Sequence, residues 1–143
     1  MNVRRAFVVA LAVAAMAGWA GGAAAAMSPE ERRALTSAER WLVPVDAGHS
    51  ANAYAMTAAD FKATVTREQG RDGMRDLRKP YGRVVLRQAE KLAFATPDPR
   101  GGPGEKIVIL FATKFVANKT AEEEVTLVRE SDGLWRVTGY FIR

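Results

Sequence analysis

The chain ends on the segment Ser131–Arg143, SDGLWRVTGYFIR, which decides the fold that we predict. Apolar and polar residues alternate from Trp135 onward, as in a strand with one buried face, and the Asp-Gly pair just before it is typical of a turn. A two-residue hairpin loop would place Arg129 opposite Arg136, and like charges directly across a sheet are destabilising. We therefore predict a three-residue loop that ends on a left-handed Gly133.

This register gives the last hairpin one apolar and one polar face. The apolar face is predicted to hold Val125, Leu127, Trp135, Val137, Gly139 and Phe141. The polar face is predicted to hold Glu122, Glu124, Thr126, Glu130, Arg136, Thr138 and Tyr140. The Tyr140 side chain should therefore point away from the core, and Gly139 should permit a bend or the close approach of a helix.

Two more strands precede this hairpin. Alternation indicates a first strand over about 83–95, where Gln88 and Glu90 interrupt the apolar parity and favour a bulge or a polar spot on the inner face. Residues 96–105 hold three prolines and three glycines and are predicted to form a loop. Residues 107–116 are apolar at both parities, which is typical of a central strand covered at least partly on both faces.

The segment that follows the first 26 residues begins with a helix signal. Ser28 and Glu31 form a capping-box pattern, and the apolar stripe behind it predicts a helix that Pro44 should kink or end. Gly48 can take positive φ just beyond the exit of this helix.

Two further helices are expected before the strands, over about 50–62 and about 67–79, the latter behind the capping-box pattern Thr66-Arg-Glu-Gln69. The order predicts an α+β domain, with N-terminal helices packed on a curved antiparallel sheet of about four strands.

The first 26 residues have the features of a bacterial export signal. A basic start with Arg4 and Arg5 precedes an apolar run over residues 6–20, and Ala24 and Ala26 form the A-x-A pattern of a cleavage site. This run is shorter than the roughly 20 residues that span a bilayer, although an uncleaved anchor stays open if the alanines to Ala26 are counted. We predict a signal peptide over 1–26, a single α+β domain over 27–143, and a periplasmic or secreted location.

Composition narrows the function classes. The 143 residues carry a formal net charge of +5, which falls to +3 without the two leader arginines, and both signs are interspersed. A nucleic-acid partner is not expected, because that function requires a one-sided basic surface. Since the chain has no cysteine, a lipid anchor at a lipobox is excluded and stability cannot rest on disulfides.

The chain resembles an uncharacterised set of exported bacterial proteins, the domain of unknown function family 4019, over about residues 36–143. The resemblance rests on Trp41-Leu42, Val45-Asp46-x-Gly48, Phe61, Val65-Thr66-x-x-Gln69, Pro80-x-Gly82, Arg87, Phe115, Asn118-Lys119, Glu124–Leu127 and the terminal Gly133-x-Trp135-Arg136-Val137-x-Gly139–Arg143. It implies a cone of helices against a curved sheet, similar to cystatin-like or nuclear-transport-factor-2-like folds. It implies no activity and no catalytic residues, because none is established for the family.

Two departures from the family pattern concern the helical part. The family usually carries an aromatic residue after the glutamine, where this chain has Gly70, and a Ser-Trp pair in the second helix, where this chain has only Tyr54. These positions bear on how the helical lid packs and on any pocket beneath it.

Residues with metal or catalytic chemistry are few. His49 is the single histidine, and a metal site built on it would need Asp46 or Asp60 without any ligand-spacing motif. We expect a surface histidine, no metal and no cofactor. An isomerase or dehydratase would instead need a carboxylate base facing a tyrosine donor across an apolar cavity. The candidate bases are Asp60, Glu90 and Asp46, and the candidate donors are Tyr54, Tyr81 and, last because of its predicted outward direction, Tyr140.

The third predicted helix carries a basic stripe. Its members are Arg67, Arg71, Arg75, Arg78 and Lys79, interleaved with Glu68, Asp72 and Asp76. Pairs of opposite charge at this spacing are typical of a solvated helix face, and a docking surface for anionic lipid or an acidic partner is the alternative.

The leading hypothesis is a non-enzymatic domain that binds a small apolar ligand or an envelope protein within or beside the cone. The pocket candidates are Trp41, Tyr54, Asp60, Phe61, Glu90, Trp135 and Phe141. The alternatives are an isomerase- or dehydratase-like enzyme and a structural envelope module. The sequence leaves a homodimer open.

Overall fold

The computed structural model describes residues 25–95 and 104–143. Residues 1–24 of the predicted leader and residues 96–103 of the predicted loop therefore lie outside the described residues. The helices of the described residues are α1 (Pro29–Asp46), α2 (Ser50–Ala55), α3 (Ala59–Thr64) and α4 (Arg67–Arg78), and the 3₁₀ helix η2 covers Val116–Asn118. The strands are β1 (Val84–Phe94), β2 (Lys106–Phe115), β3 (Thr120–Arg129) and β4 (Trp135–Ile142).

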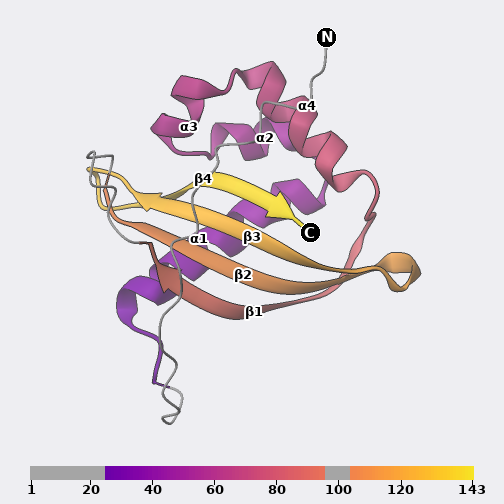
Figure 1. Ribbon diagram of the computed structural model, residues 1–143. Helices are drawn as coiled ribbons and strands as arrows, with labels where there is room; N and C mark the ends of the chain where they lie inside the picture. Colours follow the sequence, from indigo (N-terminus) through magenta and orange to yellow (C-terminus); the bar gives the residue numbers. More distant parts are fainter. Residues whose placement is uncertain (1–24, 96–103) are drawn as a thin grey trace.

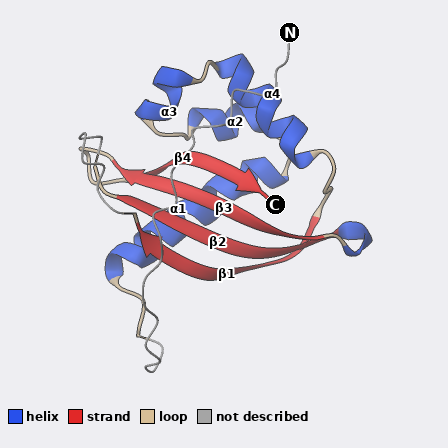
Figure 2. Ribbon diagram, viewed as in Figure 1, coloured by secondary structure: helices blue, strands red, loops and turns tan. Residues whose placement is uncertain are grey.

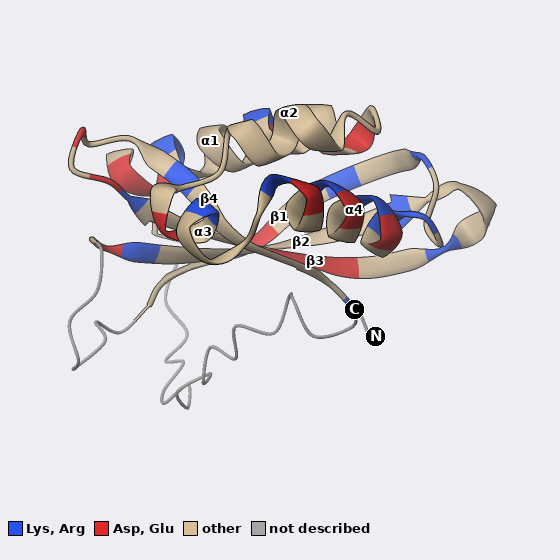
Figure 3. Cartoon of the chain, turned by 90° about the horizontal axis from the view of Figure 1, so that it is seen from above, with Lys and Arg blue, Asp and Glu red and all other residues tan. Residues whose placement is uncertain are grey.

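The four strands form one antiparallel sheet in the order β1-β2-β3-β4 (Figure 2). Helix α1 crosses one face of this sheet, while α2, α3 and α4 gather beyond its β4 edge (Figure 1). Seen from above, no described element lies on the face opposite α1 (Figure 3). The predicted α+β architecture is confirmed. Within the described residues, no helix has the length and apolar character needed to cross a membrane.

Helix α1 forms the main contact between the helices and the sheet. Its capping box is present, because the Ser28 hydroxyl accepts from the Glu31 N–H and the Glu31 carboxylate accepts from the Ser28 N–H. The helix continues two residues past Pro44 and ends at Asp46, and Gly48 has the expected positive φ of +76°. The buried stripe that packs on the sheet consists of Ala34, Ala38, Trp41, Leu42 and Val45.

The helix predicted over 50–62 is two short helices instead. The break falls where the chain joins the edge of β4, since the Ala58 N–H donates to the Val137 carbonyl at 2.8 Å and Thr57 forms a parallel bridge with Val137. A backbone N–H used by the sheet cannot continue an α-helix, so tertiary pairing overrides the local helical pattern.

Helix α4 begins with the predicted capping box of Thr66 and Gln69. Gly70 faces α2, and a Cβ atom there would lie 2.4 Å from Cδ2 of the Tyr54 ring. The two departures from the family pattern therefore compensate each other, because the absence of a side chain at Gly70 leaves room for the Tyr54 ring. The Tyr54 hydroxyl then donates to the Val65 carbonyl at 2.7 Å, which holds the ring in place.

Strand β1 contains the predicted irregularity. Its register with β2 shifts between Val84 and Leu86 and again between Ala89 and Lys91, so Glu90 lies in a bulge. The side chains of β2 alternate between a buried set on the α1 side and a partly exposed set on the other face.

The terminal hairpin confirms the predicted loop and corrects the predicted strand. The Glu130 N–H bonds to the Leu134 carbonyl at 3.0 Å, and Gly133 has a φ of +80°, so the loop has three residues. The register then shifts between Thr126 and Leu127, which leaves Thr138 as an extra residue on β4.

Because of this bulge, the side chains that follow Thr138 point to the opposite faces of the sheet from those predicted. Tyr140 lies opposite Val125 and is buried, whereas Phe141 lies opposite Glu124 with 47% of its surface exposed. The predictions that Tyr140 points outward and Phe141 inward are therefore wrong. The close approach predicted at Gly139 is absent as well, because a Cβ atom there would only reach ordinary contact with Thr126, and the bulge at Thr138 supplies the irregularity instead.

Candidate functional site

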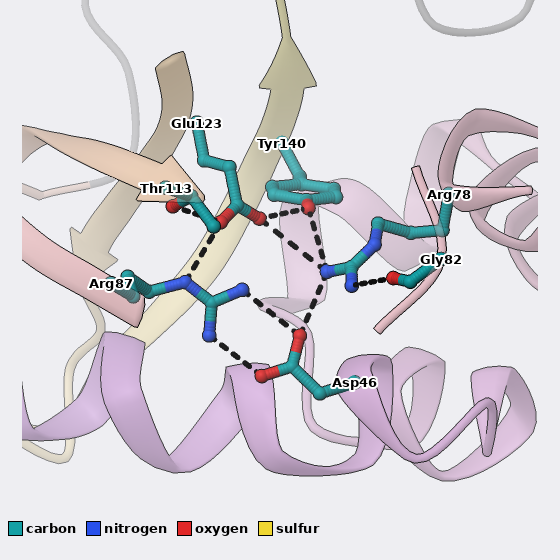
Figure 4. Close-up of polar contacts among 7 residues, drawn as sticks. All are labelled: Asp46, Arg78, Gly82, Arg87, Thr113, Glu123 and Tyr140. Atoms are coloured by element: carbon teal, nitrogen blue, oxygen red, sulfur yellow. Dashed lines mark hydrogen bonds and ion pairs between the residues drawn. The ribbon is translucent and has the colours of Figure 1, made fainter. Parts of the chain in front are cut away.

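Six polar side chains from six elements meet on the inner face of the sheet, and we call them the arginine–carboxylate cluster (Figure 4). They are Asp46 at the end of α1, Arg78 at the end of α4, Arg87 on β1, Thr113 on β2, Glu123 on β3 and Tyr140 on β4.

Arg87 connects the other members of the cluster. Its Nη1 and Nη2 atoms donate to the two Asp46 oxygens at 2.6 and 2.9 Å, and its Nε atom donates to Glu123 Oε1 at 2.7 Å. A planar guanidinium suits this paired contact with a carboxylate. The side chain thus ties β1 to both α1 and β3.

Glu123 is fully buried at 0% exposure. Its carboxylate accepts from Arg87, from the Thr113 hydroxyl at 2.5 Å and from the Tyr140 hydroxyl. A buried carboxylate is tolerated only when it is paired and hydrogen-bonded in this way.

Arg78 completes the cluster from the end of α4. Its Nη1 atom donates to Asp46 Oδ1 at 2.8 Å, and its guanidinium lies over the Phe115 ring at 5.1 Å. The contacts from Nη1 to the Tyr140 hydroxyl and from Nη2 to the Gly82 carbonyl are longer, 3.4 Å each. The buried Nε atom has no acceptor among the described residues.

Burial and mutual pairing determine the ionisation of the cluster. Burial alone would raise the pKa of Asp46, but the hydrogen bonds and charges of Arg87 and Arg78 outweigh it and lower the pKa. Burial, followed by the charge and hydrogen bond of Glu123, raises the pKa of Tyr140 well above its usual range. The cluster therefore holds a protonated phenol and an ionised Asp46 beside its arginines.

The position of Asp46 in its helix is unusual. A carboxylate at a helix C-terminus faces the negative end of the helix dipole, which is unfavourable, and the last turn of α1 contains no basic residue. The two arginines from other elements supply the missing positive charge.

A family model described as "Protein of unknown function (DUF4019)" matches residues 37–140. The chain belongs to the DUF4019 family. All six residues of the cluster lie within the matched range of this DUF4019 protein, and the predicted leader lies outside it. A comparison with curated protein sequences found no match.

Solved structures resemble the DUF4019 chain in fold. A structure described as "a putative ketosteroid isomerase" from Shewanella frigidimarina superposes with a TM-score of 0.51 at 12% identity, covering 80% of this chain and 98% of that one. Aln2 from a Streptomyces species has a TM-score of 0.49 at 16% identity, covering 81% and 91% of the two chains. At 12% identity the likeness to the Shewanella frigidimarina structure shows the fold alone, and it confirms the nuclear-transport-factor-2-like expectation.

The pocket candidates from the sequence do not meet at one place in this DUF4019 protein. Trp41 is nearest to the cluster, since its ring contacts the Tyr140 ring edge-on at 5.1 Å, but its Nε1–H is used by the Ala53 carbonyl. Tyr54 and Phe61 pack on each other at the α2–α3 side, with ring centroids 6.2 Å apart.

The remaining candidates are farther apart. Asp60 accepts from the Thr138 hydroxyl at 2.8 Å, and Trp135 donates from its ring nitrogen to Glu30 at 3.0 Å. Glu90 is exposed in the β1 bulge, and Phe141 is exposed on the opposite face of the sheet from the cluster. The structure instead brings together the candidate base Asp46 and the candidate donor Tyr140 with two arginines and Glu123.

Sequence reasoning missed Glu123 as a site residue and assigned Arg78 to a solvated stripe. Two signals were present. Asp46 stands at the wrong end of a helix dipole, and Arg87 is one of the residues that carry the family resemblance. Neither signal reveals that Arg78 and Glu123 meet in the folded protein, because these two residues are 45 positions apart in the chain.

Two open grooves mark the surface of the described residues. One lies between the α1–α2 turn and α4, lined by Gly48, His49, Ser50, Ala51, Asn52, Arg71 and Arg75. Arg71 and Arg75 both pair with Asp72, as expected for a solvated helix face. The other groove runs across β1, β2 and β3 and is lined by Leu86, Gln88, Glu90, Ala112, Thr113, Lys114, Thr120, Ala121 and Glu122. Among the described residues, no group of three acidic or histidine side chains could hold a metal ion.

Proposed function

We propose that this DUF4019 protein is an exported, non-catalytic binding module that binds a partner protein through the open face of its sheet. The open face is the one opposite α1, formed by Leu86 and Lys91 on β1, Val108, Leu110, Ala112 and Lys114 on β2, Glu122 and Glu124 on β3, and Arg136 and Phe141 on β4. The one-sided arrangement of the helices carries the proposal (Figure 3).

The open face combines apolar side chains with charges of both signs. Leu86 and Phe141 are 54% and 47% exposed, and Val108 and Leu110 are half-buried, although Thr126 and Val128 on the same face are buried. Sheets are stable when each apolar face packs against another layer. An apolar centre with a mixed charged rim is the composition of a protein interface.

Packing of the interior argues against a small apolar ligand beneath the helices. Trp41, Leu42 and Phe111 fill the space between α1 and the sheet, each with 2% exposure or less. The polar remainder of that space is occupied by the arginine–carboxylate cluster, whose members bond to one another.

An isomerase-like enzyme is the second candidate function. The observation that favours it is the direct contact between a carboxylate, Glu123, and a phenol, Tyr140. The enzyme is the second candidate because the Tyr140 hydroxyl already donates its proton to one oxygen of Glu123. The other oxygen of this carboxylate already accepts a hydrogen bond from an arginine. Conversion of a ketosteroid by the wild-type protein, with turnover lost in Glu123→Gln, would place the enzyme first.

Export is tested separately from binding. We propose that the signal peptide is cleaved after Ala26, on the strength of the basic start, the apolar run and the A-x-A pattern. N-terminal sequencing of the protein from the periplasmic fraction should begin at Met27. Recovery of the uncleaved chain from the inner membrane would contradict the proposal.

Site-specific photo-crosslinking in living cells tests the binding surface. A photoreactive residue at Leu110, in the middle of the open face, should give a discrete crosslinked product. The matched control is Val43, an apolar side chain on α1 that is 66% exposed. A product at twice the mass would identify a second copy of the chain, and another mass would identify a different envelope protein. Equal crosslinking at both positions, or none at Leu110, would refute the proposal.

A further inference from the structure

The Asp46 carboxylate lies on Arg78 and Arg87 in the way that a bound ligand would. We propose that these two arginines form an oxyanion-binding site, and that Asp46 fills it until the carboxylate or phosphate group of a small molecule displaces it. This inference is independent of the open face and would stand if the proposed function failed.

The contacts of Asp46 are those of an arginine clamp. Both of its oxygens accept from Arg87, at 2.6 and 2.9 Å, and one also accepts from Arg78 at 2.8 Å (Figure 4). Guanidinium groups bind carboxylates and phosphates alike through such paired contacts. A ligand oxyanion could therefore make the same three hydrogen bonds.

Charge balance requires an anion at this position. Without Asp46 the cluster would hold two arginines against the single carboxylate of Glu123. The arginine side chains are only 10% and 14% exposed, and an unpaired charge that is largely buried is costly. The site must therefore hold either Asp46 or an anion that replaces it.

Asp46 is the member of the cluster that can leave. Its side chain is 30% exposed, whereas that of Glu123 is fully buried. It is the last residue of α1, at the unfavourable end of the helix dipole. Pro44 lacks an N–H, which weakens the final turn, and Gly48 at positive φ lies two residues after Asp46.

The arginines keep their positions when Asp46 leaves. Glu123 holds Arg87 through Nε, and Phe115 supports the Arg78 guanidinium from below. Arg78 is also poorly satisfied, since its Nη2 contact is 3.4 Å long and its buried Nε atom has no acceptor among the described residues. An oxyanion with more oxygen atoms than the single Asp46 oxygen at Arg78 would improve its hydrogen bonding.

Anion titrations of the wild-type mature protein and of Asp46→Ala test the proposal. Sodium acetate and sodium phosphate are added in separate arms at constant ionic strength, with sodium chloride as the background. Binding is followed by calorimetry and by the NMR signals of the arginine side chains. The matched control is Asp76→Ala, which removes an exposed carboxylate paired with Arg75 at 3.4 Å.

We expect Asp46→Ala to bind acetate or phosphate at least about tenfold more tightly than the wild type, the ratio that corresponds to one charged hydrogen bond. Asp76→Ala should match the wild type. The arm with the tighter binding identifies the ligand as a carboxylate or a phosphate. Asp46→Asn keeps the size of the side chain and should give the same result if Asp46→Ala does not fold.

Three outcomes would overturn the proposal. Asp46→Ala and Asp46→Asn could show no more binding than Asp76→Ala. Binding could persist unchanged in Asp46→Ala combined with Arg87→Lys, which keeps the charge but removes the paired contact. The wild type could fail to bind either anion at any concentration, which would show that Asp46 cannot be displaced.

Discussion

The Tyr140 hydroxyl donates a hydrogen bond to the Glu123 carboxylate inside the protein, although the alternation of β4 points Tyr140 to the other face. The bulge at Thr138 makes this contact possible by shifting the register by one residue. As a result, the phenol joins two arginines and two carboxylates in one buried cluster.

Removal of the Tyr140 hydroxyl should destabilise the protein without opening a cavity. In Tyr140→Phe, Glu123 Oε2 keeps only the 3.5 Å contact with Arg78, and a buried acceptor left short of a donor costs about 1–3 kcal/mol. Urea unfolding should show this loss. The control is Tyr81→Phe, because the Tyr81 ring packs on Phe115 outside the cluster. Equal stability of Tyr140→Phe and the wild type would contradict the buried contact.

Removal of the Glu123 charge should cost more than any single hydrogen bond. Glu123→Gln leaves Arg78 and Arg87 with Asp46 as their only carboxylate, and breaking a buried ion pair from one side costs about 3–5 kcal/mol. Glu124→Gln is the neighbouring control, since Glu124 pairs with the exposed Arg143 and such pairs contribute at most about 1 kcal/mol. Similar unfolding midpoints for the two variants would show that Glu123 is not an essential partner.

Acid should remove the contribution of Asp46 to stability. Its pKa is lowered in the folded protein, because Arg87 and Arg78 outweigh the opposing effect of burial. The unfolded chain therefore binds the proton first as pH falls, so this stability is present above the ordinary aspartate pKa near 4 and is lost as pH drops through the lower folded value.

Urea unfolding of the wild type and Asp46→Asn between neutral pH and pH 2.5 measures this effect. The two curves should differ most at neutral pH and converge in acid. The difference between the variants is the relevant quantity, since Glu30, Glu31, Asp72 and Asp132 also have lowered pKa values. A difference that stays constant with pH would contradict the assignment to Asp46.

Gly70→Ala should destabilise the protein although alanine is the better helix former by about 1 kcal/mol. The new methyl group would lie 2.4 Å from the Tyr54 ring, which is held by its bond to the Val65 carbonyl. Overpacking of this kind costs about 1–3 kcal/mol. In a Tyr54→Ala background the same change should be neutral or stabilising, and a double-mutant cycle from thermal unfolding measures the coupling. Additive effects would show that the two positions do not contact each other.

Local chemistry accounts for the features that the sequence predicted. The capping boxes at Ser28 and Thr66 and the left-handed turn at Gly133 depend on residues within four positions of one another, so their patterns identify them directly. The α+β order follows in the same way, because a change from helical to alternating period separates the helices from the strands.

The cluster depends on groups that are distant in the chain, which a local pattern cannot reveal. Alternation along β4 assigned Tyr140 to the outer face, and a bulge of one residue reversed that assignment because a register shift moves every later side chain to the other face. The prediction of one helix over 50–62 was wrong for a related reason, since the Ala58 N–H, which a continuous helix would use, donates its hydrogen bond to β4.

The sequence alone therefore determined the first and last helices, the four strands, the terminal loop and the family resemblance of this protein. The tertiary structure decided which side chains meet. Arg78, Arg87 and Asp46 come from three different elements, and their charges can be buried only where Glu123 and Tyr140 supply the matching partners.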